Sequence, residues 1–150
     1  MKKLKILLVH NIIAPYRLPL FDKIALCTDL SVAYIQKKDE SRFWKQEINS
    51  KNYTSFFLPS VKKTLIGKNF FFLKAISKKI NFDEYDLIIL PDDPTYLICV
   101  YQFLFHYKKN KSISKLAFWT GNFSYYKPFD SKIMNYATTS LLFYMRKYFQ

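Results

Sequence analysis

The sequence predicts an α/β fold in which a parallel β-sheet carries helices on both faces. Short apolar runs typical of buried strands alternate along the chain with longer amphipathic segments, the pattern of a parallel sheet. Half of the 150 residues are hydrophobic and 19% are aromatic, which is enough apolar material to form a core. The first apolar run stops abruptly at His10 and Asn11, and a proline-flanked turn then continues into a helical pattern. A buried strand that feeds a loop and a helix has this appearance.

Five strands are expected from short apolar runs that end at polar residues or prolines. Residues 54–58 end at Pro59 and residues 87–90, the plainest core strand, end at Pro91, because proline cannot continue a sheet ladder. Residues 37–52 are polar and are expected to form a long excursion, and residues 61–68 a loop. The expected strands cover residues 5–10, 31–35, 54–58, 87–90 and 115–119.

Four helices are expected between and after these strands. They cover residues 18–27, 69–80, 94–108 and 131–148. The second has a broad apolar face that includes Phe70 and Ile76. The third has clear signals for the start of a helix, because Asp93 is placed to cap it and Pro94 occupies its first position. Its C-terminal end is rich in lysine, which suits the negative end of the helix dipole.

Composition excludes several classes of protein. The chain has only two glycines, so neither a dinucleotide fingerprint nor a P-loop is present. Cys27 and Cys99 both fall in apolar helical patterns without metal-ligand spacing, which indicates buried free thiols and no zinc site. Because the chain has neither phosphate-binding motif nor a zinc site, we expect no cofactor and no metal.

A formal net charge of +13 favours an anionic partner. Nucleic acid, an anionic membrane surface and phosphorylated small molecules all fit that charge. All but three of the basic residues are lysines, and a lysine-rich solvated surface is the simplest interpretation. No nucleic-acid-binding motif or arginine–aromatic cluster is present, so nucleic acid is not an expected partner. The mixed lysine and aromatic faces of the segments 69–80 and 131–148 suit either core packing or anionic lipid.

No targeting or membrane-spanning segment is evident in the sequence. The run from Ile6 has four apolar residues before His10, too few for a signal peptide, and no small-residue cleavage site follows. The longest apolar run, residues 96–105, is far short of a bilayer span. The expected location is the cytoplasm, with peripheral contact at the inner face of the cytoplasmic membrane left open.

Three segments together resemble the N-terminal lobe of the family-4-type glycosyltransferases, which have the two-lobed GT-B architecture. The first segment, residues 11–21, reads NIIAPYRLPLF. The second, residues 85–90, reads YDLIIL, and the third, residues 118–121, reads FWTG. Their order and spacing follow that lobe from one end of the chain to the other.

The resemblance implies a Rossmann-like lobe that binds the acceptor, while a second lobe binds a nucleotide sugar. Such enzymes transfer the sugar to an acceptor hydroxyl, usually with retention and without a required metal. Members similar to this chain build surface polysaccharides on a saccharide or lipid-linked acceptor. The family's donor-lobe pair of glutamates has no counterpart here. We therefore expect residues 1–150 to form one acceptor-side lobe, incomplete at its C-terminal end and inactive alone. The alternative is a non-catalytic remnant or a module that docks on a membrane or partner.

The candidate substrate-binding residues follow three expected strands, because ligands of open α/β sheets bind at the carboxyl ends of the strands. His10 and Asn11 suit hydrogen bonds to an acceptor hydroxyl or phosphate, although Asn also closes local turns. Tyr16 and Arg17 suit a phosphate, or an ion pair at the start of the first helix.

The remaining candidates follow the fourth and fifth expected strands. Asp92 is the candidate of its acidic pair, since Asp93 already has a capping role. Trp119 suits either the core or a sugar platform. Gly121 allows close backbone approach to a ligand, and Thr120 and Asn122 flank it as candidate contacts. No catalytic residue is assigned.

Overall fold

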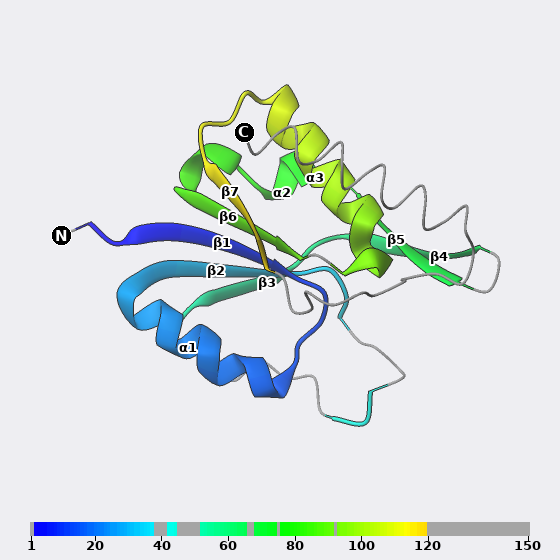
Figure 1. The fold of residues 1–150 in the computed structure, drawn as a ribbon, viewed down its shortest axis with the longest axis horizontal. Coiled ribbons are helices and arrows are strands. Elements are labelled where there is room, and N and C mark those ends of the chain that lie inside the picture. The colour runs from blue at the N-terminus through cyan, green and yellow to red at the C-terminus, as the bar shows by residue number, and fades with distance from the viewer. Residues whose placement is uncertain are drawn as a thin grey trace.

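The part of the chain that the structure describes forms a main sheet of five strands, all paired in parallel. The computed structural model describes residues 2–37, 42–44, 52–65, 68–74, 76–91 and 93–119. The strands lie in the order β3-β2-β1-β6-β7 (Figure 1). Their bounds are Leu4–His10 for β1, Thr28–Tyr34 for β2, Thr54–Phe57 for β3, Leu87–Pro91 for β6 and Lys115–Trp119 for β7. In chain order these are the third, second, first, fourth and fifth strands of the sheet. This is the strand order of a Rossmann-like sheet.

Helices cover both faces of this sheet, as the sequence predicts. Helix α1 (Leu18–Cys27) lies on one face and α3 (Leu97–Lys109) on the other (Figure 1). Alternate residues of β1 divide between the two sides, since side chains of a strand point to opposite faces. Leu8 packs with Phe21 of α1, whereas Leu7 packs with Phe103 of α3. The α/β class is confirmed.

The expected helix over residues 69–80 is wrong, and so is the expected loop over residues 61–68. Strands β4 (Ser60–Leu65) and β5 (Lys68–Leu73) form an antiparallel hairpin instead, and α2 (Ile76–Lys79) is the helical part of the described residues in this stretch. Along β5, Phe71 and Leu73 are buried while Phe70 and Phe72 are half-buried, a period of two rather than 3.6. A continuous apolar run fits either period, and pairing with β4 decides it.

The hairpin is joined closely to the rest of the protein. Gln102 of α3 accepts a hydrogen bond from the Leu73 N–H at 2.8 Å and donates one to the Leu73 carbonyl at 3.0 Å. The ring of Phe71 stacks on that of Tyr96, with ring centroids 5.1 Å apart. At the hairpin's base, the Lys74 N–H donates to the Pro59 carbonyl at 2.7 Å. The hairpin therefore leaves the main fold and returns to it at one point.

Three single turns of 3₁₀-helix complete the described elements. They are η1 (Pro15–Arg17), η2 (Phe82–Glu84) and η3 (Pro94–Tyr96). The expected cap is confirmed, because the Asp93 Oδ1 accepts a hydrogen bond from the Thr95 N–H at 2.9 Å. The first turn after Asp93 is η3, however, and α3 itself begins at Leu97.

The two cysteines differ in exposure. Cys99 is fully buried as predicted, but Cys27 is exposed, which corrects the expectation that both are buried. The reason is position: Cys27 is the last residue of α1, beyond the part of the helix that packs on the sheet.

We expect a water-soluble disulfide reagent to modify one thiol per folded chain at mildly alkaline pH. Burial raises the pKa of Cys99 to about 12, so its unreactive thiol form persists. The measurement is a thiol count with and without denaturant, and Cys27→Ser should bring the native count to zero. Rapid modification of two thiols in the native protein would contradict the burial of Cys99.

Candidate functional site

The loops that follow β1 and β6 meet at the carboxyl edge of the sheet. Strand β1 lies between β2 and β6, so the chain leaves β1 toward α1 and leaves β6 toward α3 on the opposite face. The strand order reverses at this point, which is where open α/β sheets bind ligands. The Asn11 Nδ2 donates a hydrogen bond across it to the Asp93 Oδ2 at 3.3 Å. Asp93 thus holds both the start of η3 and the loop after β1.

His10 ends β1 and is only 7% exposed. Its Nδ1 lies 2.9 Å from the Ile12 carbonyl oxygen, which can only accept, so Nδ1 carries the proton. The pKa of His10 is lowered to about 4, chiefly by burial; the hydrogen bond to the Ile12 carbonyl raises this pKa, Arg17 lowers it and Asp93 raises it. At neutral pH the ring is therefore uncharged, and its Nε2 is a hydrogen-bond acceptor. Among the residues that the structure describes, this Nε2 has no hydrogen-bond partner.

Arg17 and Trp119 come together on the α1 side of the same edge. The guanidinium carbon of Arg17 lies 5.3 Å from the centroid of the Trp119 ring and 5.8 Å from that of Tyr16. Trp119 is half-buried against the core beside Phe21, and Tyr16 is 68% exposed. Cation–π contact thus holds the arginine at the edge of the sheet, where no acidic side chain of the described residues forms an ion pair with it.

A cleft of about 890 Å³ lies on the α3 side of the edge. It extends from the Asn11–Asp93 bond to the hairpin, where Lys62 and Asn69 line it. Gln36, just beyond β2, donates a hydrogen bond from its Nε2 to the Tyr96 hydroxyl at 2.6 Å. Amide, hydroxyl and carboxylate groups thus share the cleft with the aromatic rings of Phe71 and Tyr96. The volume lies within the range of ligand pockets.

Basic side chains also line the cleft. Lys37, Arg42 and Lys62 face it, against the single carboxylate of Asp93. Arg42 also lies over the Trp44 ring, its guanidinium carbon 5.2 Å from the ring centroid. The cleft therefore combines polar groups suited to hydroxyls with basic side chains suited to an anionic group.

The structure brings some of the predicted site residues together but divides them between two sides. Asn11 lines the cleft, whereas His10, Tyr16, Arg17 and Trp119 lie on the α1 side. The other four predictions, Asp92, Thr120, Gly121 and Asn122, lie outside the described residues, as does the expected helix over residues 131–148.

Sequence reasoning missed five residues of the cleft. Gln36 directly follows the second strand, so the rule that found His10 and Asn11 would also have found it. Tyr96 was assigned only to a helix, and Asp93 only to a cap. Lys62 and Asn69 carry no signal as long as the hairpin is unrecognised, because only the pairing of β4 with β5 places them here.

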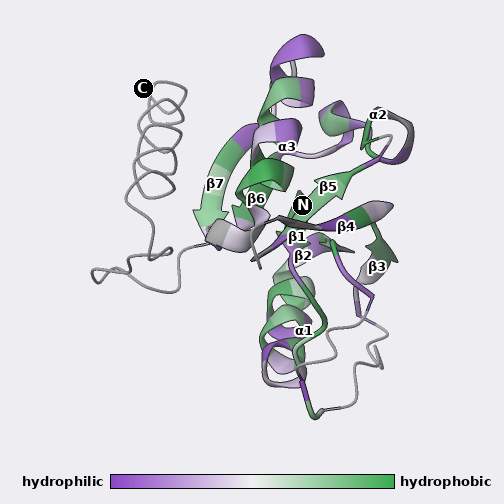
Figure 2. Cartoon of the chain, turned by 90° about the vertical axis from the view of Figure 1, so that its right-hand side faces the viewer, coloured by the Kyte–Doolittle hydropathy of each residue, from purple (hydrophilic) through white to green (hydrophobic). Residues whose placement is uncertain are grey.

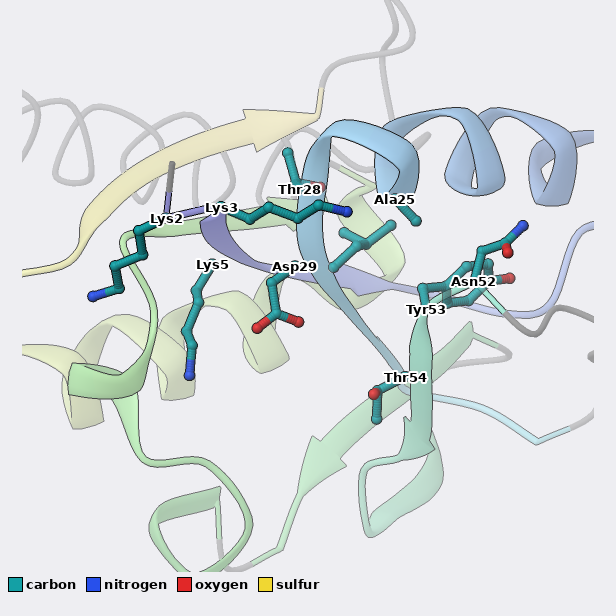
Figure 3. Close-up of a pocket in the computed structure, with 10 residues that line it drawn as sticks. Lys2, Lys3, Lys5, Ala25, Thr28, Asp29, Asn52, Tyr53 and Thr54 are labelled. Carbon is teal, nitrogen blue, oxygen red and sulfur yellow. The ribbon is translucent and has the colours of Figure 1, made fainter.

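A smaller hollow of about 470 Å³ lies at the opposite edge, where β1 to β3 begin. Lys2, Lys3, Lys5 and Asp29 are among the residues that line it (Figure 3). The three ammonium groups point in different directions rather than toward one point, and Asp29 brings a carboxylate among them (Figure 3). This arrangement does not form a cradle for an anion, so the carboxyl-edge cleft is the candidate site.

The described residues contain neither a cluster of metal ligands nor a membrane-spanning helix. No group of three or more His, Cys, Asp and Glu side chains in that part of the chain is placed to hold a metal ion. No helix among the same residues combines the length and apolar character needed to cross a bilayer.

Comparison of the chain with protein-family models, with curated proteins and with solved structures finds no match.

Proposed function

We propose that residues 1–150 form the acceptor-side lobe of a two-lobed GT-B-type glycosyltransferase. In this proposal the enzyme transfers a sugar from a nucleotide donor to a saccharide or lipid-linked acceptor in surface polysaccharide synthesis. The nucleotide sugar is bound by a second lobe that these residues do not include. The parallel sheet, its strand order and the three sequence segments that resemble the family support the proposal.

One observation carries the proposal: the polar cleft at the point where the strand order reverses, held by the Asn11–Asp93 hydrogen bond. A saccharide presents several hydroxyl groups that both donate and accept. Fixed amide, carboxylate and phenol groups satisfy these hydroxyls, and an aromatic ring packs on the apolar face of a sugar ring. Asn11, Gln36, Asp93 and Tyr96 supply those groups within the cleft.

The α1 side of the edge adds an acceptor atom and a cation. In the proposal, the Nε2 of neutral His10 accepts a hydrogen bond from a hydroxyl, since its lone pair is free of a proton at neutral pH. A pKa near 4 makes this nitrogen a weak base, so it orients a hydroxyl rather than removing its proton. Arg17 pairs with a phosphate of the acceptor or of a donor brought by the other lobe.

We expect the isolated chain to bind a saccharide acceptor but to catalyse no transfer. The test is a titration of the isotopically labelled chain with oligosaccharides, glycosyl phosphates and nucleotide sugars, followed by the backbone amide signals. Acceptor saccharides should shift the signals of Asn11, Gln36 and Asp93. Asp93→Asn keeps the cap oxygen but removes the charge, and Asn11→Ala removes the bridge; each should weaken binding about tenfold or more.

Lys23→Ala, on α1 and away from the cleft, is the control and should leave acceptor binding unchanged. Failure of all acceptor saccharides to bind would contradict the proposal. Turnover of a nucleotide sugar by this chain alone would contradict its division between two lobes. The first result would favour the non-catalytic alternative, and the second would favour an enzyme that is complete in one lobe.

A further inference from the structure

The β4–β5 hairpin has two faces with different surroundings. Cross-strand pairing places Lys62 opposite Phe71 and Thr64 opposite Asn69 on one face. Three of these side chains, Lys62, Asn69 and Phe71, line the cleft. Because successive side chains of a strand alternate, the neighbouring residues form the other face. This outer face consists of Val61, Lys63, Phe70 and Phe72, with Val61 opposite Phe72 and Lys63 opposite Phe70.

The phenylalanines of the outer face belong to neither hydrophobic core of the described residues. Phe70 and Phe72 are half-buried, yet they are absent from the clusters that pack on α1 and α3. The Nζ of exposed Lys63 lies 5.7 Å from the centroid of the Phe72 ring. The outer face is therefore an apolar strip with a cation beside it. In Figure 2, β5 is largely hydrophobic along its length.

The charge of the hairpin has one sign. Residues 60–74 contain four lysines and no aspartate or glutamate. An amphipathic surface of phenylalanine, valine and lysine suits the headgroup region of an anionic bilayer, where apolar side chains enter and cations meet lipid phosphates. Nucleic acid fits less well, because Val61 offers no stacking surface and the hairpin carries no arginine.

We propose that the outer face of the hairpin docks the protein on anionic membrane surfaces. The hairpin extends beyond the carboxyl ends of the main strands (Figure 1). Since its other face lines the cleft, docking brings the cleft to the membrane surface. This inference extends the proposed function by naming the surface that meets a lipid-linked acceptor. Membrane binding is measured without any acceptor, so either proposal can fail while the other stands.

The first experiment is co-sedimentation of the chain with phosphatidylcholine vesicles, with and without about a third of phosphatidylglycerol. Binding is expected only to the anionic vesicles and should weaken as salt is raised. The double variant Phe70→Ser/Phe72→Ser should weaken binding about tenfold or more. Lys63→Gln should weaken it about fivefold, the effect of one cation near a charged surface.

The matched control is Tyr101→Ser/Phe105→Ser on α3. Tyr101 and Phe105 are 46% and 56% exposed, so they are an alternative pair of aromatic side chains that could enter a membrane. Their double variant should bind vesicles as the parent does. Loss of binding in this control and not in the hairpin variant would overturn the proposal. So would the absence of binding to anionic vesicles, or binding to single-stranded RNA alone.

A second measurement does not depend on removing apolar side chains. Phe72→Trp places a fluorophore on the outer face, and its emission should shift to the blue on anionic vesicles and be quenched by brominated lipid. Phe105→Trp on α3 is the control, and its added emission should stay unchanged. Equal quenching of both variants, or of neither, would contradict docking by the hairpin.

Discussion

Replacing Phe21 by alanine is expected to destabilise the protein by about 3–5 kcal/mol, the largest effect that we predict for a single substitution. Phe21 is fully buried beneath the α1 side of the candidate site. Its ring makes edge contacts with His10, Tyr53 and Trp119, with centroids 5.6, 6.1 and 6.3 Å away. Alanine removes all three contacts and leaves a cavity that the surrounding sheet and helix fill only in part. Urea unfolding at neutral pH measures the loss.

Leu20→Ala is the matched control for this prediction. Leu20 precedes Phe21 in α1 but is 42% exposed, so its truncation should cost about 0.5 kcal/mol. Similar losses for the two variants would mean that α1 does not pack through Phe21. The cavity should also admit water to His10, which would raise the histidine pKa toward its ordinary value.

Acidification from pH 7 to about 5 is expected to cost about 2 kcal/mol of stability through His10 alone. Its pKa is lowered from 6.5 to about 4 in the folded protein, chiefly by burial. Between these values the unfolded chain binds a proton that the folded protein does not, so falling pH favours unfolding. The stabilisation is complete above pH 6.5 and is lost progressively as the pH falls toward 4.

The difference between the parent and His10→Asn isolates this effect from the titration of carboxylates. Asparagine keeps an N–H donor for the Ile12 carbonyl but does not titrate in this range. Urea unfolding at both pH values should show the extra acid sensitivity only in the parent. An identical pH dependence in the two proteins would mean that His10 is not buried in its neutral form.

The architecture of the sheet could be predicted from the sequence because strand signals there are local. A four-residue apolar run ended by proline, as in residues 87–90, has few alternatives in a chain of this kind. Parallel strands end at a common edge of the sheet. This rule also predicted that the loops after the first and fourth expected strands form the same side of a ligand site. The hydrogen bond between Asn11 and Asp93 joins those two loops, which are 82 residues apart.

The hairpin could not be predicted in the same way, because residues 70–73 are apolar without a gap. Such a run has no period of its own, and Ile76 and Ile80 extend it into an apparent helical face. The sequence offered only a weak turn signal there, Gly67, because the Ile-Gly pair is not a typical hairpin turn. The cleft residues on the hairpin were missed with it, since their position depends on the pairing of β4 with β5.

The closed base of the hairpin makes it a replaceable unit. The Lys74–Pro59 hydrogen bond brings the two ends of residues 60–73 to one point, and the order of the main sheet does not involve them. Insertion, deletion or exchange of the distal part, from Val61 to Phe70, leaves every strand of the main sheet paired. Such changes require that Phe71 and Leu73 stay in place, because they cover Tyr96 and Cys99 in the core. Related chains can therefore vary the length and chemistry of this segment, and with it the surface they recognise, while keeping one scaffold.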